Sequence, residues 1–129
     1  MDFAPPTDYQ LIDTGDALER FAQSLAKVTC LAVDLEADSM FHFQERVCLI
    51  QIATDKQTVV IDPIECSDLT VLQPIFSDPA VCKIFHGADY DVRSLFRDFA
   101  IDVHNLFDTQ LASMYLGYRD TGLDAVLQR

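Results

Sequence analysis

The stretch from Leu31 to Ala53, LAVDLEADSMFHFQERVCLIQIA, decides the fold of this chain. Its apolar start and its apolar end, from Val47 onward, each predict a buried strand. Asp34 and Glu36 stand one residue apart at the end of the first strand, and alternate residues of a strand point to the same face. Two carboxylates about 4 Å apart repel by about 4 kcal/mol at an effective dielectric constant of about 20. Such a pair favours splaying apart, sharing a proton or holding a cation.

The spacing of these two acids is also typical of solvated carboxylates at a strand end. The chain is rich in acids, and Glu36-x-Asp38 and Asp89-x-Asp91 share the same spacing. The pair alone therefore favours the solvated interpretation, and the case for a metal site depends on the second half of the chain.

Composition sets the class of protein. The chain has 129 residues, 50% of them hydrophobic, which indicates one globular domain. Its apolar runs are short and interrupted by charge, so no membrane span is expected. Its four cysteines lack a Cys-x-x-Cys pair, which favours reduced thiols in a cytoplasmic protein. The net charge of −12 argues against a broad basic surface for nucleic acid, although bound metal ions can supply positive charge locally.

The order of the predicted elements indicates the fold class. Three strands joined by short turns predict an antiparallel meander, and a helix leads to a fourth strand that should lie parallel to the first. Together they predict an α/β fold with a ribonuclease-H-like mixed sheet flanked by helices. The strands are expected at 29–35, 47–54, 58–61 and 81–86. The helices are expected at 16–27, 67–76 and 89–99, the last with a core stripe of Val92, Leu95, Phe96 and Phe99, and a further helix is expected after Asp108.

A third carboxylate follows the fourth strand. Asp91 falls in the first turn of the helix at 89–99, so it can face Asp34 and Glu36 if the first and fourth strands are neighbours. Three carboxylates are hard oxygen ligands suited to Mg²⁺ or Mn²⁺. A two-metal site, with ions about 3.5–4 Å apart, activates a water and stabilises the leaving oxygen of a phosphodiester.

Three ordered segments resemble a known family. DLE at 34–36 with VCLIQ at 47–51, HGADYD at 86–91 and LFDTQLA at 106–112 are similar to segments of the ribonuclease D family, the DEDD 3′–5′ exonucleases. The resemblance covers about residues 9–129. It implies a metal-dependent 3′–5′ exoribonuclease that removes nucleotides singly from single-stranded RNA 3′ ends, as in transfer-RNA maturation and RNA turnover.

The resemblance also implies roles for individual residues. Asp34 and Glu36 are expected to hold the metal that generates the nucleophilic water, and Asp91 to help hold the second. Leu35, through its backbone, and the segment from Met40 to His42 are expected near the terminal nucleotide. His86 is a further candidate substrate contact, although a histidine hydrogen-bonded inside the fold at a strand end fits the pattern as well. Other residues have one or two interpretations each. Asp108 is expected to be a helix cap or a ligand, and Asp89 a first-turn acid. Arg93 and Arg97 are expected to be phosphate contacts or solvated charges. The side chains of Met40, Phe41 and Phe43 are expected to stack on a base or to pack within the fold.

The sequence departs from the family pattern in two places. The third motif, Tyr-x-x-x-Asp, has no counterpart after the second motif, and Gly87 stands where many family members carry Asn. We therefore expect residues 1–129 to be the N-terminal part of an exonuclease domain, weak or inactive alone, with a possible second copy covering the exposed core. The main alternative is a non-catalytic RNA- or protein-binding module on a degenerate exonuclease fold. DNA proofreading within a larger polymerase assembly shares the metal chemistry.

Overall fold

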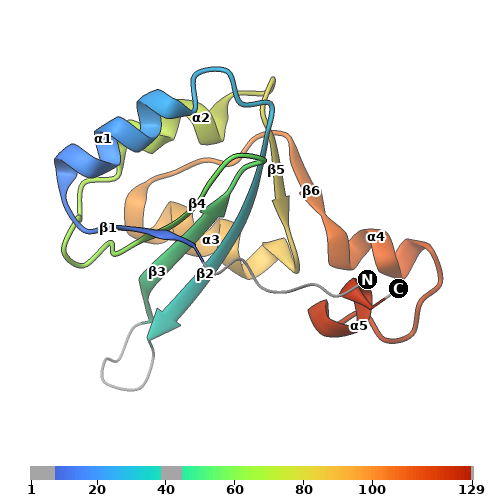
Figure 1. The fold of residues 1–129 in the computed structure, drawn as a ribbon. Helices are drawn as coiled ribbons and strands as arrows, with labels where there is room; N and C mark the ends of the chain where they lie inside the picture. The colour runs from blue at the N-terminus through green and yellow to red at the C-terminus, as the bar shows by residue number, and fades with distance from the viewer. Residues whose placement is uncertain (1–7, 39–44, 129) are drawn as a thin grey trace.

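In a computed structural model that describes residues 8–38 and 45–128, six strands form one mixed sheet in the order β1-β4-β3-β2-β5-β6 (Figure 1). The strands are β1 (Gln10–Ile12), β2 (Cys30–Asp38), β3 (Arg46–Ala53), β4 (Thr58–Ile61), β5 (Cys82–Phe85) and β6 (Leu106–Asp108). The helices are α1 (Gly15–Ser24), the 3-10 helix η1 (Thr70–Leu72), α2 (Gln73–Ser77), α3 (Ala88–Phe99), α4 (Thr109–Tyr115) and α5 (Leu123–Leu127). Helices α4 and α5 lie beyond β6, to one side of the sheet.

The strand pairings confirm the predicted fold class. Strands β2, β3 and β4 form an antiparallel meander, and β5 lies parallel to β2. Strand β6 extends the parallel half of the sheet beside β5, while β1 pairs parallel with β4 at the other edge. The central strand β2 therefore has a hydrogen-bonded neighbour on both sides, and this strand carries Asp34 and Glu36.

Burial alternates along β2, so the two faces of the sheet differ. Leu31, Val33 and Leu35 are buried, whereas the residues between them are exposed. The buried face packs against α1, η1, α2 and α3 in one hydrophobic cluster. Members of this cluster from the helices are Leu18, Phe21, Leu72, Phe76 and Leu95. The carboxylates of β2 stand on the opposite, exposed face.

The predicted helix at 67–76 is wrong in its first half. The chain instead forms η1 and the short helix α2. The Asp68 carboxylate accepts hydrogen bonds from the Thr70 backbone N–H at 3.0 Å and from the Thr70 hydroxyl, which favours a turn over a helix at this point. Pro74 lies in the first turn of α2, where a missing N–H costs no hydrogen bond.

The prediction that Phe96 belongs to the core stripe of α3 is also wrong. Phe96 is 59% exposed, whereas Ala88, Asp91 and Leu95 are buried. The buried face follows the spacing i, i+3, i+7 from Ala88, and Phe96 lies about 100° around the helix from Leu95. In the part of the chain that the structure describes, every helix falls short of the length and apolarity needed to cross a membrane.

Candidate active site

Two of the predicted site residues lie side by side on the exposed face of β2. Asp34 is paired with Gln51 of β3, and Glu36 with Leu49. Both carboxylates leave the strand on one face, as the alternation predicted. The register of β2 against β3 shifts directly after Glu36, where a bulge increases the local twist.

Asp91 reaches the same region from α3. It lies in the first turn of the helix that directly follows β5, the parallel neighbour of β2. Burial, together with the charges of Asp34, Glu36 and Asp108, raises the pKa of the Asp91 carboxyl to about 6. The charges of Asp34 and Glu36 therefore act on Asp91, while the predicted convergence of the three carboxylates on one metal site stays a prediction.

The donor chemistry of this cluster fits a hard divalent cation, because carboxylate oxygens are the ligands that Mg²⁺ and Mn²⁺ prefer. Within residues 8–38 and 45–128, however, no three His, Cys, Asp or Glu side chains form a group that could hold a metal ion. The carboxylates are thus coupled through their charges rather than gathered around a common point. Metal ligation by Asp34, Glu36 and Asp91 stays a prediction.

The predicted substrate contacts fall in different settings. The Leu35 side chain is 8% exposed and points into the core, so this residue can meet a substrate only through its backbone. Met40 and His42, with Phe41 and Phe43, lie outside the described residues. Their predicted contact with a terminal nucleotide is untested.

His86 already has a partner in the protein for each ring nitrogen. Its Nε2 lies 2.8 Å from the Thr121 carbonyl oxygen, so Nε2 donates, because a carbonyl only accepts. Its Nδ1 lies 2.8 Å from the Thr109 hydroxyl oxygen, and the same hydroxyl donates to the Phe85 carbonyl oxygen at 3.1 Å. His86 thus ties the segment before α5 to the end of β5. Its predicted contact with substrate stays a prediction.

Asp108 has a positioning role that the sequence predicted only in part. It caps α4, as expected, by accepting from the backbone N–H groups of Gln110 and Leu111. It also accepts from the N–H groups of Gly87 at 3.0 Å and Ala88 at 2.7 Å, at the start of α3. Burial pushes the pKa of Asp108 up, but these four hydrogen bonds outweigh it and hold the pKa below its usual value. Asp108 therefore fixes the turn from which Asp91 projects.

Further contacts join α3 to the start of β3. The Val47 N–H donates to the Asp98 carboxylate at 2.8 Å, and the Tyr90 hydroxyl donates to the Glu45 carboxylate. These contacts hold α3, and with it Asp91, against the sheet.

The two arginines of α3 form ion pairs within the helix. Arg93 pairs with Asp89 at 2.9 Å, and Arg97 pairs with Asp98 at 2.7 Å. The Arg93 and Asp89 side chains are 71% and 89% exposed, which makes their pair a solvated one worth little to stability. Asp89 is the expected first-turn acid.

Curated proteins similar to this chain include RRP6-like proteins and an exosome component. It is 41% identical over 121 residues to Protein RRP6-like 3 of Arabidopsis thaliana, a match covering 93% of this chain and 14% of that protein. It is 37% identical over 123 residues to exosome complex component 10 of Homo sapiens, covering 95% of this chain and again 14% of the relative. The chain thus spans about one seventh of the length of these relatives.

Solved structures share the fold. The catalytic core of RRP6 from Trypanosoma brucei matches with a TM-score of 0.82 and 36% identity, over 86% of this chain and 31% of that one. Escherichia coli RNase D matches with a TM-score of 0.81 and 27% identity, over 87% and 30% of the two chains. The family model described as 3′–5′ exonuclease matches residues 9–129. The chain therefore belongs to the 3′–5′ exonuclease family, with relatives of the RRP6 and RNase D type.

Proposed function

We propose that this chain carries part of the active site of a 3′–5′ exoribonuclease that acts on the 3′ ends of single-stranded RNA. The observation that carries the proposal is the placement of Asp34 and Glu36 on one face of β2, with Asp91 in the first turn of the helix that follows the neighbouring strand β5. The charges of Asp34 and Glu36 raise the pKa of Asp91. Relatives named as exosome components, and an RNase D described as an exoribonuclease involved in structured RNA processing, support RNA as the substrate.

The proposed mechanism assigns Asp34, Glu36 and Asp91 to hold two Mg²⁺ or Mn²⁺ ions. Such ions, when bound, activate a water and stabilise the leaving oxygen of a phosphodiester. Pairing of β2 with β3 at Asp34 and Glu36 fixes the backbone from which the two carboxylates project. Asp91 is held by the helix start that Asp108 caps. The net charge of −12 repels a phosphate backbone, so RNA approach depends on the positive charge of the ions.

Two further proposals concern the setting of the protein. Its free cysteines support a reducing compartment such as the cytoplasm.

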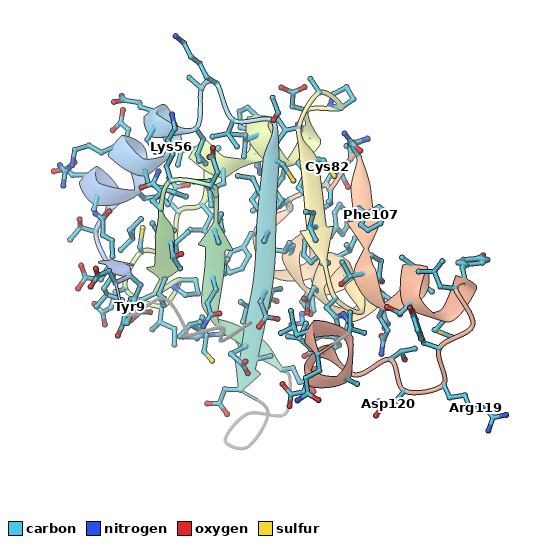
Figure 2. All side chains as sticks on the ribbon, turned by 45° about the vertical axis from the view of Figure 1, so that its right-hand side comes forward. Tyr9, Lys56, Cys82, Phe107, Arg119 and Asp120 are labelled. Carbon is cyan, nitrogen blue, oxygen red and sulfur yellow. The ribbon has the colours of Figure 1, made fainter. Side chains whose placement is uncertain are left out.

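Exposed apolar side chains on β6 and α4 support association with a second copy of the chain through this surface. They include Leu106, Phe107, Leu111, Met114 and Leu116, and Figure 2 labels Phe107. Sedimentation velocity of the wild type and of Met114→Glu checks this, with dissociation expected for the variant.

RNA binding tests the proposed function. Fluorescence anisotropy of a labelled single-stranded RNA should rise with added protein in Mg²⁺ and stay low in excess EDTA. A linear competitor with a free 3′ hydroxyl should displace the probe better than a circular RNA of the same sequence. The variant Asp34→Asn should lose the Mg²⁺-dependent binding, whereas Asp55→Asn, in the exposed turn between β3 and β4, should keep it. Binding that is equal with and without Mg²⁺ would instead support a non-catalytic RNA-binding module.

A further inference from the structure

Two cysteines stand opposite each other across β2 and β5. The parallel register pairs Cys30 with Cys82, so their side chains project from the same face of the sheet. Adjacent strands lie about 4.8 Å apart, and disulfides join residues whose Cα atoms are about 4.4–6.8 Å apart. The backbone spacing of this pair is therefore compatible with a disulfide.

The two thiols also interact. Burial raises the pKa of the Cys30 thiol, and the charge of Cys82 and a hydrogen bond with the Cys82 side chain raise it further. Both cysteines are free, with Cys30 exposed and Cys82 partly buried on the uncovered face of the sheet. Figure 2 labels Cys82 at the start of β5, beside β2. The sulfur atoms are thus neighbours that solvent can reach from the Cys30 side.

A cavity opens beside Cys30, the more exposed thiol of the pair. It has a volume of about 500 Å³, and its lining includes Cys30, Ile84, Lys27 and Lys56. Cavities of this size accept small molecules. The lining also includes Asp55, so two lysines face one carboxylate and the edge keeps a net positive charge, which suits a ligand that carries carboxylates.

We propose that Cys30 and Cys82 form a reversible disulfide by exchange with oxidised glutathione, an anionic peptide disulfide that enters through this cavity. The Cys30 thiolate attacks one glutathione sulfur and releases one glutathione as a thiol after protonation. The Cys82 thiolate then attacks the Cys30 sulfur of the mixed disulfide and releases the second glutathione. The two protein thiols lose two protons and two electrons in total, and one glutathione disulfide becomes two glutathiones.

The cross-link joins the two strands that lead to the carboxylate cluster. Cys30 lies four residues before Asp34 on β2, and β5 leads directly into the helix that carries Asp91. A disulfide here fixes β2 against β5 whether or not the cluster binds metal, so the inference is independent of the proposed function. Because Cys30 is exposed, reducing thiols can reopen the bond.

Mass spectrometry of the 129-residue chain tests the proposal. The reduced protein is incubated with glutathione disulfide at pH 8, and remaining thiols are trapped with iodoacetamide. Two of the four thiols should be lost, with the mass of two hydrogens removed and no glutathione retained. Trypsin should then release peptide 28–46 joined to peptide 57–83, and dithiothreitol should separate them.

Serine variants assign the bond. Peptide 57–83 also contains Cys66, so Cys66→Ser must keep the cross-link, and Cys48→Ser serves as a second control that keeps it. Cys30→Ser and Cys82→Ser must lose it, and each should retain one glutathione on the remaining cysteine. The proposal is overturned if all four wild-type thiols stay titratable. It is equally overturned if glutathione accumulates on both cysteines without a cross-link, or if the joined peptides persist in Cys82→Ser.

Discussion

The Asp108 carboxylate accepts a hydrogen bond from the Ala88 backbone N–H at 2.7 Å, so one side chain joins the start of α4 to the start of α3. Its other oxygen accepts from three further backbone N–H groups. Asp108→Asn replaces one acceptor oxygen with an amide donor, and we expect the free energy of unfolding to fall by about 1–3 kcal/mol. Urea denaturation at pH 7 measures this, and Asp55→Asn, on an exposed turn, should change stability by less than about 0.5 kcal/mol.

The same residue predicts a pH dependence. The pKa of the Asp108 carboxyl is lower in the folded chain than its ordinary value, because four hydrogen bonds outweigh the effect of burial. The contribution of the Asp108 carboxylate to the free energy of unfolding is therefore complete above the unfolded-state pKa, about 4. This contribution is lost as the pH falls through the lower folded-state pKa. The stability difference between the wild type and Asp108→Asn should shrink between pH 7 and pH 3. A stability difference that stays constant over this pH range contradicts the assignment of the stabilisation to the ionised Asp108 carboxylate.

Gly87 occupies a conformation that favours glycine. Its φ is 73°, and an added Cβ would lie 2.9 Å from the Gln110 Oε1 atom. Gly87→Ala should lower the free energy of unfolding by about 1–2 kcal/mol, because the left-handed conformation strains any residue with a Cβ. Gly87→Asn should cost less, since Asn tolerates this region better. Gly15→Ala is the matched control, because nothing lies within 4 Å of its added Cβ. Chemical denaturation of the four proteins compares these effects.

Lys83 is fully buried and donates three hydrogen bonds. Its Nζ lies 2.7 Å from the carbonyl oxygens of Asp78 and Val81 and 2.9 Å from that of His104. Burial lowers the pKa of its ammonium group. Lys83→Met removes the donors from three carbonyls and should lower the free energy of unfolding by about 2–4 kcal/mol. Thermal denaturation should show a large drop for Lys83→Met and almost none for the exposed Lys56→Met. Equal stability of the two variants rules out this role.

The chain alone should hydrolyse RNA slowly or not at all. The predicted site has three carboxylates, and the family's Tyr-x-x-x-Asp motif has no counterpart after the second motif in these 129 residues. A 5′-labelled single-stranded RNA should therefore stay intact in Mg²⁺ on a sequencing gel. A ladder of shortened products that disappears with Asp34→Asn would show that three carboxylates are sufficient.

Local patterns predicted most of the fold. Alternation along β2 and short turns predicted the meander, and the connection through a helix predicted that β5 would lie parallel to β2. These features also predicted that the helix carrying Asp91 would begin next to the strand carrying Asp34 and Glu36, because β5 leads directly into α3. Contacts between residues far apart in the sequence were harder to predict. The capping of α4 by Asp108 follows from its neighbours, but its bonds to Gly87 and Ala88 bridge about twenty residues.

Burial also depends on contacts that a local sequence pattern cannot show. A charged residue such as Lys83 is normally exposed, and only the three carbonyls from separate segments explain why it is buried. Phe96 matched the apolar spacing of α3, yet the sheet covers a neighbouring face of the helix. In both cases the deciding contacts come from segments that the local pattern does not contain.

Thermal melting in Mn²⁺ tests the central claim, that Asp34, Glu36 and Asp91 form a metal site, most directly. A ligand at 100 times its Kd adds about 2.7 kcal/mol to stability, so saturating Mn²⁺ should raise the melting temperature of the wild type by several degrees. Asp34→Asn and Asp91→Asn should lose this shift, and Asp55→Asn should retain it. Identical wild-type melting with and without millimolar Mn²⁺, or a shift that survives Asp34→Asn, contradicts the account.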